Sequence, residues 1–74
     1  MRRALGAVGY RPAIPTLIDL LLAQTGMLRG CAAWSLGALG ATQARHPLQE
    51  ALARETHPYA QERMRVALEE IGVG

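Results

Sequence analysis

The chain has 74 residues, half of them apolar, and its formal net charge at pH 7 is +2. A chain of this length buries only about 60% of the surface that its unfolded form exposes, so it can build one small domain with a thin margin of stability. Its single cysteine excludes an internal disulfide framework, and one cysteine with two histidines cannot complete a structural zinc site. Alanine, leucine and glycine outnumber aromatic residues, which favours close-packed helices over a β-sandwich.

Charge is distributed unevenly along the chain. Residues 1–45 carry five arginines and one acidic residue, whereas residues 46–74 carry three arginines and five glutamates. All eight basic residues are arginine, which codon usage explains as readily as a need for phosphate contacts does. No signal peptide is evident, and the best apolar run, 17–23, is interrupted by Asp19 and too short to span a bilayer. These features predict a soluble, cytoplasmic protein with no membrane partner.

Two sequence motifs recur at a fixed spacing. The first, LGAVG at 5–9, recurs as LGALG at 36–40 and more loosely as LEEIG at 68–72, with offsets of 31 and 32 residues. The second has an offset of 31 residues and aligns Ala13, Leu17, Asp19 and Leu21 with Ala44, Leu48, Glu50 and Leu52. Self-similarity at one period is the signature of a repeat architecture in which each unit is one supersecondary element.

The first elements in chain order are an orphan helix and one complete repeat. Residues 2–8 match the end of a repeat's second helix, and the first helix of that repeat is missing. The repeat at 12–40 begins at Pro12, and its first helix carries an apolar stripe formed by Ile14, Leu17, Ile18, Leu21 and Leu22. After a break at 24–26, a second helix is predicted at 27–39. The residues expected to face the core are Leu28, Ala32, Ser35, Leu36 and Leu39. Gly40 then supplies a left-handed helix stop.

A second complete repeat occupies residues 42–72. Thr42 is the expected N-cap of a helix that ends near Arg54, and Pro47 is expected to make its first turns irregular. A break at 55–58 precedes the last helix, at 59–71. The whole chain, 1–74, therefore reads as one all-α domain of about five helices and two and a half repeats, in a right-handed α–α superhelix without β-strands. Because the array starts in the middle of a repeat, we expect a fragment of a longer chain; the alternative is a small stand-alone protein whose open end pairs with a partner.

The segment 28–40, LRGCAAWSLGALG, resembles the short HEAT-like repeat of phycobilisome-lyase-type proteins. Within that class, the pattern Arg29-Gly30-x-Ala32-Ala33-Trp34-x-Leu36-Gly37 is similar to the C-terminal repeats of epoxyqueuosine reductases, and so is the element RRALGAVG at 2–9. The likeness covers nearly the whole chain. It departs from that family at Arg3, where the family commonly has asparagine, and at Ala23 or Gln24, where the family has an aspartate that anchors the turn.

The resemblance implies a non-catalytic module at the C-terminus of an oxidoreductase of queuosine-tRNA modification. Such a parent enzyme would use cobalamin and iron–sulfur clusters held in domains that precede the repeats. Iron–sulfur ligation needs closely spaced cysteines, and this chain has one. We therefore expect no catalytic residue, no metal site and no cofactor in the chain itself, which would help to hold tRNA. The alternative is a protein–protein interaction scaffold, the commoner task of such arrays.

Four residues are candidates for binding nucleic acid or a protein partner: Arg2, Arg3, Arg29 and Trp34. The arginines lie in or beside successive second helices and could contact phosphates. The alternative for Arg29 is a structural role, in which it hydrogen-bonds turn carbonyls and an acid such as Asp19. Trp34, the only tryptophan, lies opposite the predicted core stripe and should be partly buried at most. It either anchors a partner or packs against a neighbouring repeat or domain.

The open N-terminal end predicts self-association. Leu5 and Val8 would leave apolar surface uncovered, and exposed patches of this kind recruit partners. Isolated chains should therefore dimerise or exchange their first helix. Sedimentation analysis checks this expectation, and a pure monomer at millimolar concentration would contradict it.

Overall fold

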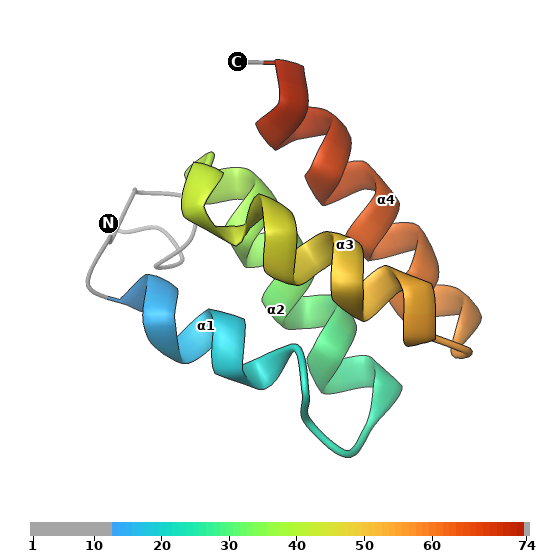
Figure 1. Ribbon diagram of the computed structural model, residues 1–74. Helices are drawn as coiled ribbons and strands as arrows, with labels where there is room; N and C mark the ends of the chain where they lie inside the picture. The colour runs from blue at the N-terminus through green and yellow to red at the C-terminus, as the bar shows by residue number, and fades with distance from the viewer. Residues whose placement is uncertain (1–12, 74) are drawn as a thin grey trace.

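The computed structural model describes residues 13–73, and all regular structure in this range is helical (Figure 1). The helices are α1 (Ile14–Leu20), α2 (Gly26–Leu39), α3 (Arg45–Arg54) and α4 (Pro58–Val73), and a short 3-10 turn, η2 (Thr42–Ala44), leads into α3. The predicted all-α fold is confirmed, and residues 13–73 contain no strand. The expected orphan helix at 2–8 lies outside the described residues.

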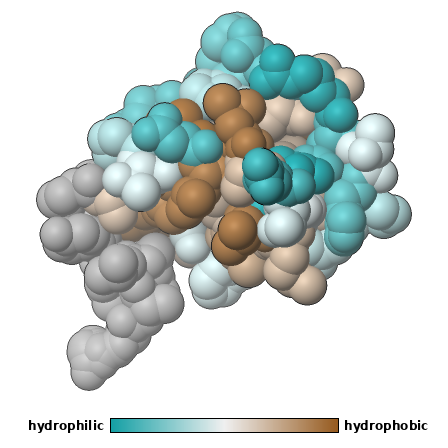
Figure 2. Space-filling model, turned by 90° about the horizontal axis from the view of Figure 1, so that it is seen from below, coloured by the Kyte–Doolittle hydropathy of each residue, from teal (hydrophilic) through white to brown (hydrophobic). Residues whose placement is uncertain are grey.

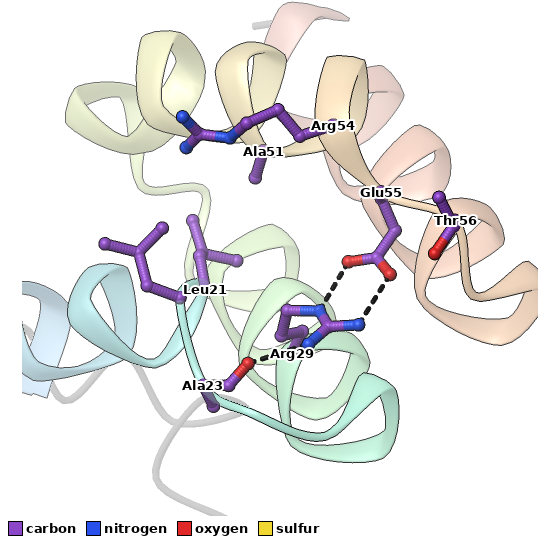
Figure 3. Close-up of a pocket in the computed structure, with 8 residues that line it drawn as sticks. Leu21, Ala23, Arg29, Ala51, Arg54, Glu55 and Thr56 are labelled. Carbon is purple, nitrogen blue, oxygen red and sulfur yellow. Dashed lines mark hydrogen bonds and ion pairs between the residues drawn. The ribbon is translucent and has the colours of Figure 1, made fainter.

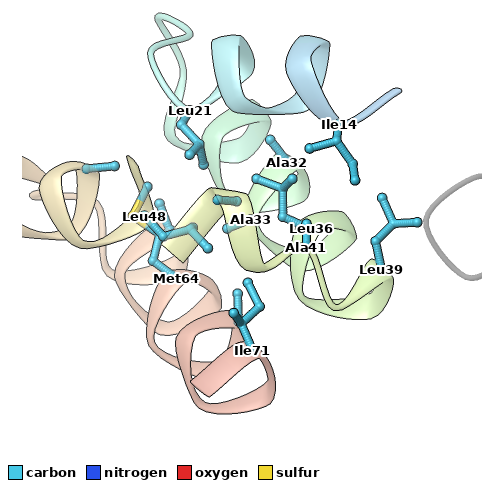
Figure 4. Packing of buried hydrophobic residues seen from close by; sticks show 14 residues of the cluster. Ile14, Leu21, Ala32, Ala33, Leu36, Leu39, Ala41, Leu48, Met64 and Ile71 are labelled. Carbon is cyan, nitrogen blue, oxygen red and sulfur yellow. The ribbon is translucent and has the colours of Figure 1, made fainter. Parts of the chain in front are cut away.

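The four helices form two hairpins, α1–α2 and α3–α4, that lie side by side. Helix α1 packs on α2, α3 packs on α4, and the two hairpins are joined mainly by the contact between α2 and α4. In Figure 1, α1 and α3 lie nearer the viewer, and α2 and α4 lie behind them. A single apolar cluster fills the space between the helices, with Ile14, Leu36, Leu48, Met64 and Ile71 as its largest fully buried members (Figure 4).

The structure corrects two of the residues that were expected in the core. Helix α1 stops at Leu20, so Leu22 falls in the following turn and is 70% exposed. Leu28, in the first turn of α2, is 50% exposed, whereas Ala32, Leu36 and Leu39 of the same predicted stripe are buried. Helix α2 therefore has two buried rows. One is the predicted row of larger side chains, and the second is a row of small residues on the side of α4, formed by Gly26, Gly30, Ala33 and Gly37.

The helix ends follow from local chemistry. Thr25 caps α2, since its Oγ1 accepts a hydrogen bond from the backbone N–H of Leu28 at 3.2 Å. Gly40 ends α2 in the left-handed conformation with φ 62°, as predicted. The expected N-cap role of Thr42 is wrong, because α3 is entered through η2 and has no side-chain cap. Pro47 lies in the first turn of α3, where a missing N–H removes no helical hydrogen bond.

Two glycines allow α2 to approach α4 closely. A Cβ placed on Gly37 would lie 2.5 Å from Glu70 Oε1 and 2.9 Å from the Cα of Ala67, and a Cβ on Gly30 would collide with the ring of Tyr59. The backbone of Ala67 cannot move aside as a flexible side chain can. The packing therefore requires glycine, which has no Cβ, at position 37.

Replacing Gly37 by alanine should destabilise the fold by about 1–3 kcal/mol, because overpacking at the contact outweighs the gain in helix propensity. The matched control is Gly72→Ala in α4, where an added Cβ meets nothing within 4 Å and stability should be unchanged or slightly higher. Urea unfolding followed by circular dichroism measures both variants. Equal stability of the two would show that the close approach is dispensable.

Candidate interaction surface

An ion pair connects the two hairpins at their turns (Figure 3). Arg29 donates from Nε to Glu55 Oε1 at 2.6 Å and from Nη2 to Glu55 Oε2 at 2.8 Å, a two-pronged arrangement. Its Nη1 donates to the backbone oxygen of Ala23 at 2.7 Å. The side chain of Glu55 is only 2% exposed and that of Arg29 is 21% exposed. Arg29 thus holds the turn after α1 against the turn after α3.

Glu55 has further partners that fix the second turn. Its carboxylate accepts a hydrogen bond from the backbone N–H of His57 at 3.0 Å, and its backbone oxygen accepts one from Gln61 Nε2 at 2.8 Å. The hydrogen bond from Arg29 lowers the pKa of Glu55; burial opposes this shift, and the His57 N–H adds to it. The same contact raises the pKa of Arg29. Arg29 therefore makes the kind of contacts that its alternative, structural role predicts, with a turn carbonyl and an acid. The acid is Glu55 and not Asp19.

Trp34 lies in a row of uncharged side chains on the exposed side of α2. Met27, Cys31, Trp34 and Ala38 follow one another at intervals of four, three and four residues and are all exposed. Trp34 itself is 46% exposed, which agrees with its expected position opposite the core. Tryptophan is highly buried on average in folded proteins, and it is enriched at protein-binding surfaces.

A second row on α4 flanks the first. Tyr59, Arg63, Val66 and Glu70 have the same spacing and stand 32 residues after their counterparts on α2. The ring of Tyr59 and the stem of Arg63 pack over Gly30, and the carboxylate of Glu70 lies over Gly37. Cys31 Sγ and Tyr59 Oη, 3.9 Å apart, join the rows near one end. We call these eight residues the two-row face.

A pocket outside the two-row face lies between α1 and α3, and the Arg29–Glu55 pair lines part of it (Figure 3). It has a volume of about 280 Å³ and adjoins a second pocket of about 250 Å³, with Leu21, Leu22, Ala51 and Arg54 lining both. Figure 2 shows apolar surface in the middle of the underside of the molecule, bordered by hydrophilic surface. Four exposed apolar side chains cluster around the α1–α2 turn: Leu20, Leu22, Met27 and Leu28. The pockets are lined by acidic and basic residues together, so they favour no one class of ligand.

The structure describes two of the four predicted site residues, Arg29 and Trp34, and they do not share a site. Trp34 is exposed on the two-row face, Arg29 is bound to Glu55, and Arg2 and Arg3 lie outside the described residues. Sequence reasoning missed Arg63 and Glu70, although the offset of 32 residues that relates α4 to α2 could have indicated them. It had no signal for Glu55, whose partner lies 26 residues away in sequence.

The described residues show neither a metal site nor a membrane-spanning helix. Within residues 13–73, no group of three or more His, Cys, Asp or Glu side chains is placed to hold a metal ion. None of the helices in this range combines the length and the apolar character needed to cross a membrane. The described residues therefore offer two surfaces for binding, the two-row face and the pockets between α1 and α3.

The Arg29–Glu55 pair makes stability depend on pH. Because the pKa of Glu55 is lower in the folded chain, its contribution is present above the ordinary glutamate value, 4.5, and is lost as pH falls through the lowered value. Glu55→Gln should cost roughly 2–3 kcal/mol of unfolding free energy at pH 7, and the difference from the native chain should shrink at pH 3. Glu50→Gln, at a side chain that is 60% exposed, is the control. Urea unfolding at both pH values measures this, and a pH-independent difference would contradict the assignment.

Comparison with known proteins bears on the fold and not on a ligand. A family model of HEAT repeats matches residues 2–69, which is nearly the whole chain and includes both hairpins. Searches of curated proteins and of solved structures find no match. The family model describes the repeat itself and carries no information about a parent enzyme. The predicted HEAT-like architecture is confirmed, and the chain belongs to the HEAT repeat family.

Proposed function

We propose that this chain is a non-catalytic protein-binding module, and that a partner protein binds on the two-row face with Trp34 as the central anchor. HEAT repeats commonly serve as interaction scaffolds, and stacked second helices give such proteins their extended binding surfaces. The observation that carries the proposal is Trp34, 46% exposed in a row without charge. A tryptophan in this setting supplies a large apolar contact at a small cost in side-chain entropy.

Charge favours a protein over RNA as the partner. Residues 13–73 contain five arginines and six acidic residues, a net charge of −1. Arg29, the phosphate-contact candidate in this range, already directs three of its nitrogens to Glu55 and Ala23. RNA binding draws its affinity from clustered cations that displace counterions. A surface with this balance has little to offer a phosphate backbone.

The finer role implied by the resemblance, holding tRNA for an epoxyqueuosine reductase, is a second candidate. Its support is the basic character of the sequence up to residue 45, with five arginines against one acidic residue. Since Arg29 is engaged with Glu55, the phosphate contacts would depend on Arg2 and Arg3. The test of the proposed function therefore includes RNA as the alternative ligand.

A displayed library of random peptides, selected on the purified chain, should yield ligands whose binding depends on Trp34. Trp34→Ala should weaken these ligands on the order of 30-fold, as loss of an interface anchor does. The matched control is Leu22→Ala, which removes an exposed apolar side chain next to the other surface and should leave binding unchanged. Titration calorimetry measures both, after circular dichroism has shown that each variant is folded.

The same chain is titrated with a tRNA anticodon stem–loop at low and moderate salt. Salt-sensitive RNA binding, together with a library that yields no ligand, would replace the protein-binding proposal by the tRNA role. Ligands that respond to Leu22→Ala and not to Trp34→Ala would move the site to the pockets between α1 and α3.

A further inference from the structure

The two-row face carries one cation and one anion, placed on either side of Trp34. On α4, Arg63 packs against Gly30 and Glu70 against Gly37, and these glycines precede and follow Trp34 on α2 by four and three residues. Helices α2 and α4 run in the same direction, so the order along the face is Arg63, Trp34, Glu70. The seven residues from Arg63 to Glu70 correspond to roughly 10 Å along the helix axis.

Neither charge has a partner within residues 13–73. The ion pairs in this range are Arg29–Glu55, His46–Glu50 and Arg65–Glu62, and none includes Arg63 or Glu70. Their side chains also make no hydrogen bond to another described residue. Both are thus available at the border of an apolar contact. Charges in this position select a partner and its register more than they add affinity.

The spacing of the face fits a helix. Both rows advance by four, three and four residues, which is how one face of an α-helix advances. The same spacing already occurs in a helix–helix contact of this molecule. The small row of α2 lies on the side of α4, with Gly37 against Ala67, and the buried residues of α4 (Ala60, Met64, Ala67 and Ile71) also advance by four, three and four. Rows spaced in this way accept the ridges of a third helix.

From this arrangement, and resting on the proposed function, we infer that the partner segment is an amphipathic helix with a mixed charge pattern. Its apolar stripe lies over Trp34 and Ala38. An acidic residue on one side of the stripe meets Arg63, and a lysine or arginine about seven residues away meets Glu70. Helices with only basic or only acidic residues at these two positions are disfavoured, because one of the pairs then becomes repulsive. The face therefore selects by charge pattern and not by net charge.

Double-mutant cycles on a peptide from the library test the charge pattern. Glu70→Lys should weaken the selected peptide about 3- to 10-fold, and replacing the peptide's basic residue by glutamate should restore binding to the Glu70→Lys chain. Arg63→Glu should behave likewise with the peptide's acidic residue replaced by lysine. Each restored pair must bind better than either single change. The cycles give the same answer whichever way the helix lies on the face.

The control is Glu50→Lys, which changes net charge equally but lies on α3 beside the pocket, and it should alter affinity less than twofold. Selected peptides that depend on Trp34 but show no coupling to Arg63 or Glu70 would overturn this inference and leave the proposed function intact. A library that yields no Trp34-dependent peptide would overturn both. An independent readout is the loss of affinity with rising salt, which should occur in the native chain and be absent from the uncharged double variant Arg63→Ala/Glu70→Ala.

Discussion

Helices α2 and α4 meet where α2 has no side chain to separate them, at Gly30 and Gly37, and this close approach determines what the rest of the molecule can do. It lets the apolar row of α4 reach the core through Ala60, Met64 and Ala67, all almost fully buried. It also brings the α4 row of the two-row face next to the row that contains Trp34. Two helices from different repeats therefore present one continuous surface. A bulkier residue at position 37 would move α4 outward and disrupt core and surface together.

The Arg29–Glu55 pair connects the two hairpins at their turns, as the close approach at the glycines connects them along α2 and α4. The turn after α1, at 21–25, contains no acidic residue, yet it is held, because Arg29 binds the carbonyl of Ala23 and Thr25 caps α2. The anchor of this turn is thus an arginine from the next helix. Its counter-charge comes from the following repeat, so the geometry of one turn depends on its neighbour. Single-repeat truncations would leave Arg29 without its acid.

Local features of the fold could be predicted from the sequence, and features that depend on contact between repeats could not. The period, the helices, the break before α2 and the stop at Gly40 follow from patterns within a few residues of one another. The second buried row of α2, which includes Gly30 and Ala33, is set by α4, and nothing in the sequence of α2 alone indicates it. Glu55 looked like a loop residue and is a buried acid. Trp34 could be identified as a candidate from the sequence. Its position opposite the core follows from the periodicity of a single helix and does not depend on contact between repeats.

The row on α2 also determines where chemical probes can report. Cys31, the only cysteine, is exposed and stands three residues before Trp34, the only tryptophan. A dye attached to the thiol would therefore sit within energy-transfer distance of the indole, on the surface assigned to the partner. Bulky reagents at Cys31 would occupy that surface, and a bound partner would slow their reaction. Both intrinsic labels thus observe the same face of the molecule, and neither observes the pockets between α1 and α3.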